Sequence, residues 1–138
     1  MKINAEVFER AQAVIDRLSI EYRERAQSDL ENLYVTMDLA QTEEAERQEH
    51  LQKIRAVLHD MRGQGGTFGL PLVTQIAKSL GTYLKSGEAA ENPSFEIAQA
   101  HFEAIRHVLA ENISDQNSER GRQIVEDLRT STGMSVEP

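Results

Sequence analysis

The segment LQKIRAVLHDMRGQGGTFG, residues 51–69, sets the fold that the chain is expected to adopt. Its apolar side chains recur every three or four residues, which is typical of the buried face of an α-helix; they are Leu51, Ile54, Leu58 and Met61. The same helix then meets glycines at positions 63, 65 and 66. Each glycine in a helix interior costs about 1 kcal/mol relative to alanine. We infer that side chains must be absent at these positions for a reason other than helix stability.

The lone histidine of this segment is expected to face solvent. At roughly 100° per residue, His59 points well away from the centre of the apolar arc, toward solvent. Gly63 and Gly66 follow it by four and seven residues and therefore lie beside it on the same face. Arg62 flanks the same patch. The sequence thus predicts an exposed imidazole on a surface without neighbouring side chains, next to one cation.

This arrangement suits phosphoryl chemistry. A neutral imidazole is available as a nucleophile near neutral pH, and its attack on phosphorus gives a phosphohistidine. Arg62 can pair with phosphoryl oxygens, and the bare glycines let the active site of another protein close over the ring. A helix end is the alternative interpretation, with Gly63 or Gly66 as the terminating residue. That alternative explains one glycine but not three.

Helical periodicity extends toward the N-terminus. Residues 4–40 are expected to form one long helix, or two joined near Ser19. Thr42 is expected to cap the next helix, with Glu43 and Glu44 in its first turn, and this helix, about 43–66, is expected to lie centrally. The shared apolar face of the first region consists of Val7, Phe8, Ala11, Val14, Ile15, Leu18, Tyr22, Ala26, Leu30, Leu33, Tyr34 and Met37.

Three further helices are expected toward the C-terminus. Pro71 begins one that ends at Gly87, Asn92 and Pro93 cap and begin the next, and about 117–130 forms a short last helix. Their inner faces are Leu72, Val73, Ile76, Leu80 and Leu84, then Phe95, Ala98, Phe102, Ile105, Val108 and Leu109, then Ile124, Val125 and Leu128. The expected fold is all-α, an antiparallel four-helix bundle with additional terminal helical segments. Residues 1–130 are expected to form a single domain and residues 131–138 a flexible tail.

Composition excludes several classes of function. The 138 residues fit one globular domain, and the net charge of −8 argues against nucleic-acid or anionic-membrane partners. Without cysteine the chain has no disulfide or thiolate chemistry. It has no apolar run of signal or membrane length, so a cytoplasmic location is expected. The residues three before the four histidines are Arg47, Ala56, Ala98 and Ala104. None is a carboxylate, so Glu-x-x-His metal pairs are excluded, and no metal or cofactor is expected.

The order His59-x-x-Arg62-Gly63, with Gly69 ten residues after the histidine, resembles a known pattern. Histidine-containing phosphotransfer (HPt) domains of multistep phosphorelays have H-x-x-K/R-G, a stretch of small residues, and a glycine that closes the turn. The local resemblance covers about residues 55–84. The expected helical bundle extends it to nearly the whole chain.

Three residues depart from the pattern of that family. Arg62 stands where lysine is commoner, which keeps the charge but changes its geometry. Gln64 is larger than the serine or alanine often found there. Some members hold the histidine ring with a glutamine on the next helix, and counting across places Gly81 at that position.

The resemblance implies that His59 is phosphorylated on Nε2 by the phospho-aspartate of a receiver domain and passes the phosphoryl group to a second receiver. It implies no autonomous kinase activity, since receivers supply Mg²⁺ and most catalytic groups. Arg62, Gly63, Gln64 and Gly66 are then the candidates for contact with the phosphate or the partner, and the chain is expected to be a monomer. The alternative is a non-catalytic helical adaptor or dimerisation module that binds a receiver without phosphotransfer. The long N-terminal helix keeps it open, and a buried His59 would favour it.

Overall fold

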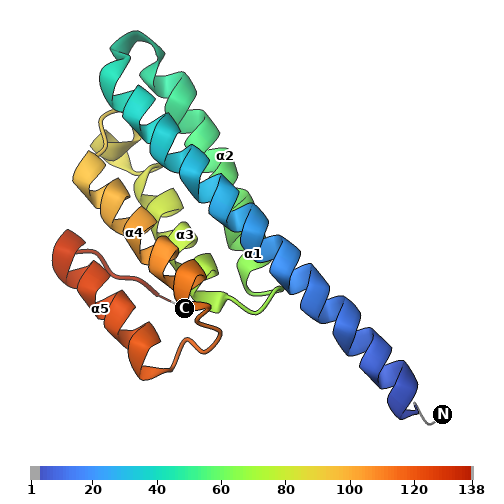
Figure 1. Ribbon diagram of the computed structural model, residues 1–138. Helices are drawn as coiled ribbons and strands as arrows, with labels where there is room; N and C mark the ends of the chain where they lie inside the picture. Colours follow the sequence, from blue (N-terminus) through green and yellow to red (C-terminus); the bar gives the residue numbers. More distant parts are fainter. Residues whose placement is uncertain (1–3, 138) are drawn as a thin grey trace.

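The computed structural model describes residues 4–137, which form helices and connecting segments without a strand (Figure 1). The α-helices are α1 (Ala5–Thr42), α2 (Arg47–Gly65), α3 (Pro71–Tyr83), α4 (Phe95–Glu111) and α5 (Glu119–Thr132). Short 3₁₀ helices, η1 (Glu44–Glu46) and η2 (Gly87–Ala90), lie in two of the connections. The predicted all-α class is confirmed.

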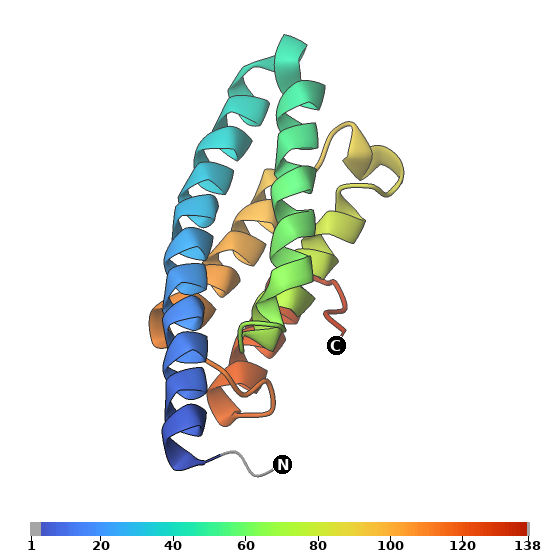
Figure 2. The same cartoon turned by 90° about the vertical axis from the view of Figure 1, so that its right-hand side faces the viewer.

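Helices α1 to α4 form the bundle (Figures 1 and 2). Helix α2 packs against α1 and α3, α4 packs against the same two helices, and α5 covers α4. Helices α2 and α3 run antiparallel, since Arg55 Nε donates to the carbonyl of Leu84 at 3.1 Å while Gly66, at the other end of α2, bonds to Thr74. The predicted inner faces of α2 and α3 are confirmed, because all of these side chains are buried: Leu51, Ile54, Leu58, Met61, Leu72, Val73, Ile76, Leu80 and Leu84.

Of the two alternatives for the N-terminal region, the structure has one continuous helix of 38 residues. Asn4 caps it, accepting a hydrogen bond from the backbone N–H of Val7 at 2.8 Å. From Tyr22 onward its apolar face is buried in the bundle. Before Tyr22 the apolar side chains are exposed, and Figure 1 shows this half of α1 projecting past the end of the bundle. The periodicity therefore identified a face correctly, but the chain itself covers only its second half.

The expected start of the second helix was wrong. Thr42 is the last residue of α1, and its hydroxyl donates to the carbonyl of Asp38 at 3.0 Å instead of capping α2. A 3₁₀ turn, Glu44–Glu46, comes between, and α2 begins at Arg47. The hydroxyl of a threonine near a helix end can bond back to the preceding turn, and here that local bond prevailed.

The expected cap of the fourth helix was also wrong. Ser94 is the N-cap, accepting from the backbone N–H of Ile97 at 3.3 Å, and Phe95 is the first helical residue. The amide oxygen of Asn92 accepts a hydrogen bond from Arg47 Nη1 at 3.0 Å. A tertiary contact thus uses the side chain that the sequence offered as a cap, and the serine next to the helix takes that role.

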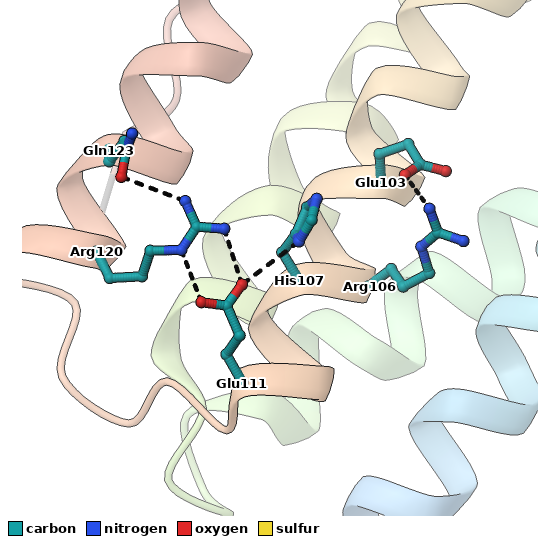
Figure 3. A network of polar contacts seen from close by, with 6 residues as sticks. All are labelled: Glu103, Arg106, His107, Glu111, Arg120 and Gln123. Atoms are coloured by element: carbon teal, nitrogen blue, oxygen red, sulfur yellow. Dashed lines mark hydrogen bonds and ion pairs between the residues drawn. The ribbon is translucent and has the colours of Figure 1, made fainter.

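Helix α5 is attached to α4 by apolar packing and by a polar network (Figure 3). Arg120 donates from Nε and Nη2 to the two carboxylate oxygens of Glu111, at 2.7 and 2.8 Å. His107 Nδ1 lies 3.4 Å from the same carboxylate, and Arg120 Nη1 also donates to Gln123 at 3.3 Å. The hydrogen bonds from Arg120 lower the pKa of Glu111. This bidentate pair adds a specific polar contact between α4 and α5 to the apolar packing of Ile124 and Leu128.

The C-terminal segment is partly packed. Helix α5 continues to Thr132 and closes at Gly133, whose φ of 70° lies in the left-handed region. Val136 is buried, and its carbonyl accepts a hydrogen bond from Arg129 Nη2 at 3.1 Å. The division into a domain of residues 1–130 and a flexible tail of 131–138 stays a prediction. Within that tail, Val136 is part of the apolar core.

Candidate functional site

His59 is exposed near the C-terminal end of α2. Its neighbours Leu58 and Met61 are each 1% exposed and anchor this turn in the core. The helical period therefore places the imidazole on the side of α2 that faces away from the bundle, as predicted. A buried histidine was the observation that would have favoured the adaptor, and it is not found.

Gly63 lies one turn beyond His59, within α2. A β-carbon built on Gly63 would meet no atom within 4 Å. Neither packing nor a helix end requires glycine at this position, because the helix continues to Gly65. The missing side chain leaves the helix backbone bare beside the imidazole, and the exposed Arg62 is the neighbouring cation.

Gly65 and Gly66 have different roles from Gly63. A β-carbon on the buried Gly65 would lie 2.6 Å from Thr74 Oγ1 and 3.0 Å from the carbonyl oxygen of Leu70. Gly65 is thus needed for the close approach of α3 to α2. Gly66 is the C-cap of α2, with φ −63° and ψ −39°. The helix-end interpretation therefore describes Gly66, and the left-handed turn that follows is at Gly69, with φ 82°.

Thr74 is a residue of this region that the sequence analysis missed. Its hydroxyl donates to the carbonyl of Arg62 at 3.0 Å and accepts from the backbone N–H of Gly66 at 2.9 Å. The last turn of a helix leaves carbonyl groups without partners inside the helix, and Thr74 satisfies one of them from α3. The signal in the sequence is a threonine that follows directly on the apolar start of the helix, PLVT, residues 71–74.

Gln64, predicted as a contact residue, is half-buried and is engaged with α1. Its side-chain oxygen accepts a hydrogen bond from Arg25. Close by, Phe68 stacks on Tyr22 with ring centroids 4.9 Å apart. The last turn of α2 and the loop that follows it are therefore held against α1, the former by a polar contact and the latter by an aromatic one. Of the predicted residues, Arg62, Gly63 and Gly66 are exposed with His59, whereas Gln64 is turned toward α1.

Helix α3 carries a glycine, Gly81, close to the level of His59. The contacts of Arg55 with Leu84 and of Arg62 with Thr74 set the antiparallel register, in which α3 residues of about 77–80 lie level with His59 and Gly81 follows directly after them. A β-carbon on Gly81 would meet no atom within 4 Å. Gly81 itself offers no side chain that could support the imidazole in the way that a glutamine could.

The other three histidines are tied into the structure. His50 Nε2 lies 2.7 Å from a carboxylate oxygen of Glu43, and His107 belongs to the α4–α5 network. His101 is buried, with Nδ1 2.8 Å from the carbonyl of Ile97 and Nε2 3.0 Å from Ser79 Oγ. Burial lowers the pKa of His101. Nδ1–H then donates to the carbonyl, and Nε2 accepts from the serine.

Residues 4–137 contain neither a cluster of metal ligands nor a membrane-spanning helix. No group of three or more histidine, cysteine, aspartate or glutamate side chains in that range could hold a metal ion. No helix within the same range is long and apolar enough to cross a membrane.

Comparison with known proteins gives a family match. A family model described as "Hpt domain" matches residues 6–129. No curated protein matches the chain, and no solved structure matches it. The match spans nearly the whole chain and includes the His59 region and all four bundle helices.

Proposed function

Since the chain belongs to the Hpt domain family, we propose that His59 carries a phosphoryl group between receiver-domain aspartates in a phosphorelay. Domains of this family are histidine-containing phosphotransfer modules and phosphocarriers, not classic enzymes. The observation that supports His59 as the carrier is its exposure beside the bare backbone of Gly63. The three other histidines each have a structural partner.

The proposed transfer needs one nucleophile from this chain. The Nε2 lone pair of His59 attacks the phosphorus of the phospho-aspartate, an N–P bond forms, and the P–O bond to the aspartate breaks, so that the carboxylate leaves. The reverse sequence of bonds delivers the phosphoryl group to a second receiver. Mg²⁺ and most catalytic groups come from the receiver, and this chain has no kinase activity of its own.

The neighbouring residues have distinct proposed roles. Arg62 pairs with phosphoryl oxygens through a charge-assisted contact. Gly63 and Gly66 keep the surface low, so that the rim of a receiver active site reaches the ring. Gln64 contributes at the edge of this surface through its bond to Arg25. Receivers are the proposed partners, and the cytoplasm is the proposed location.

Transfer of labelled phosphate from a panel of phosphorylated receivers tests the proposal. Label should appear on the chain, should be lost in acid as a phosphoramidate is, and should be absent with ATP alone. His59→Gln should abolish labelling, whereas His50→Gln and His107→Gln should keep it. Labelling that survives His59→Gln would refute the assignment. A receiver that binds tightly but never labels His59 would support the adaptor instead.

A further inference from the structure

The N-terminal part of α1 has an apolar face that nothing in residues 4–137 covers. We call residues 5–21 the α1 overhang. Its exposed side chains are Val7, Phe8, Val14, Ile15 and Leu18, with 50%, 64%, 44%, 55% and 42% of their surfaces exposed. With Ala11 they fall in an arc of about 120° that contains no charged residue. Monomeric soluble proteins rarely expose apolar patches larger than a few hundred Å², so this face is expected to have a partner.

The exposed face is continuous with the core face of the same helix. Leu18 is followed one turn later by Tyr22 and then by Ala26, both buried by the bundle. The stacking of Phe68 on Tyr22 marks the end of the bundle. A partner on the overhang therefore lies on the side of α1 where the bundle lies, and it must stop where the bundle begins.

We propose that the partner is a second copy of this chain, with the two α1 overhangs packed antiparallel. Phe8 then lies opposite Leu18 of the second copy and Ala11 opposite Ile15, while the two Val14 side chains approach each other near the twofold axis. The pairing is isologous, so each apolar side chain meets one from the same set.

The position of the bundle decides the direction. In a parallel pair, the second bundle would follow its α1 onto the face that the first bundle already occupies from Tyr22 onward. In an antiparallel pair, each bundle lies beyond the described N-terminal end of the other helix. The two overhangs have equal length, so their overlap ends where each bundle begins.

The area and the charges fit a protein partner of this kind. The apolar side chains of the overhang expose on the order of 500 Å² of surface in each copy. A pair would therefore bury on the order of 1,000 Å², which is about the minimum for a specific interface. The ionised side chains of the overhang are Glu6, Glu9, Arg10, Asp16, Arg17 and Glu21, and none lies in the apolar arc. Helices that bind membrane surfaces carry mainly lysine and arginine on their polar face. Here acidic residues outnumber basic ones.

The first test is the mass of the full chain in solution, measured from low micromolar to sub-millimolar concentration. The wild type should reach twice the monomer mass of 15.5 kDa. Ile15→Glu should weaken the dimer at least tenfold. Ile20→Glu is the matched control, because Ile20 is 52% exposed on the same helix outside the apolar arc, and it should leave the dimer intact.

Two outcomes would overturn the proposal. One is a wild-type chain that stays monomeric at every concentration, and the other is equal weakening by Ile20→Glu and Ile15→Glu. If the wild-type chain is monomeric and Ile15→Glu instead lowers its binding to a receiver or to anionic vesicles, the overhang is a receiver or membrane contact. The measurement uses unphosphorylated protein, so its result does not depend on the chemistry proposed for His59. A dimer would also replace the monomer expected from the sequence.

Disulfide trapping tests the antiparallel direction, since the chain has no cysteine of its own. Phe8→Cys and Leu18→Cys should each give little covalent dimer alone and much more when the two variants are mixed. Ile20→Cys reports random collisions. Efficient crosslinking of Phe8→Cys with itself would indicate a parallel pair and contradict the proposed arrangement.

Discussion

Gly65 lies so close to Thr74 that a β-carbon on Gly65 would be 2.6 Å from the threonine hydroxyl and 2.9 Å from its backbone nitrogen. A β-carbon built on Gly63, two residues earlier, would have no atom within 4 Å. We expect Gly65→Ala to destabilise the fold by roughly 1–3 kcal/mol, because α3 must move away. Gly63→Ala should be neutral or stabilise it by about 0.5–1 kcal/mol, because alanine favours the helix. Urea unfolding of both variants measures the difference, and equal losses would contradict this account of the two glycines.

Substitutions at Gly63 also distinguish an effect on receiver docking from an effect on folding. Gly63→Gln should keep the helix, since the position is open, but should place a side chain beside His59. Phosphotransfer from a receiver should fall while the melting temperature holds or rises. Melting and transfer are measured on the same preparations of wild type, Gly63→Ala and Gly63→Gln. Unchanged transfer in a stable Gly63→Gln would show that the receiver docks elsewhere.

The parts of the site that lie on one helix could be predicted from the sequence. The exposure of His59 follows from the spacing of Leu51, Ile54, Leu58 and Met61, because all of them share one helical period. The contact of Gly65 with Thr74 could not be predicted, because it depends on how closely a second helix approaches. Glycine has no side chain to show whether it faces solvent or a neighbour.

The error at the start of α4 has a similar origin. Asn92 and Ser94 both suit an N-cap, and in the structure Asn92 instead bonds to Arg47, a residue far away in the sequence. The apolar face of the α1 overhang has the same periodicity as the buried face after Tyr22. Periodicity identifies a face that needs covering, but it does not say which part of the molecule covers it.

The cation next to His59 is expected to act on the phosphoryl group and not on the fold. Arg62 is exposed, and the bond between this residue and Thr74 uses the backbone carbonyl, which substitution keeps. Arg62→Ala should therefore slow transfer by roughly fivefold, equivalent to about 1 kcal/mol for an exposed charged contact. Arg62→Lys should be milder, and Arg62→Glu should be worse than alanine. Transfer by Arg62→Glu at the wild-type rate would exclude a role for this charge.

The hydroxyl of Thr74 is expected to stabilise the end of α2. Thr74→Val removes the donor to the Arg62 carbonyl and the acceptor for the Gly66 N–H while keeping a similar shape. The loss should be about 1–2 kcal/mol, whereas Thr74→Ser should retain most of the stability. Hydrogen exchange at the Gly66 amide gives a local readout, and this amide should exchange faster in Thr74→Val. Equal stability of the valine and serine variants would mean that the two hydrogen bonds contribute nothing.

The buried His101 should make stability depend on pH in a defined window. Burial lowers the pKa of His101 in the folded state, so the unfolded chain binds a proton at this residue more readily, near its ordinary pKa of about 6.5. Stability contributed by neutral His101 should be complete above that pH and should decrease as the pH falls toward the folded-state pKa. The slope cannot exceed about 1.4 kcal/mol per pH unit for one proton.

Urea unfolding between about pH 5 and 7.5 should show this slope in the wild type and in His107→Gln, whose histidine is exposed. His101→Gln should be less stable overall but should lose this part of the slope. The comparison uses the slope of the unfolding free energy against pH and not its absolute value, so a destabilised variant still gives a result. An unchanged slope in His101→Gln would assign the titration to another group.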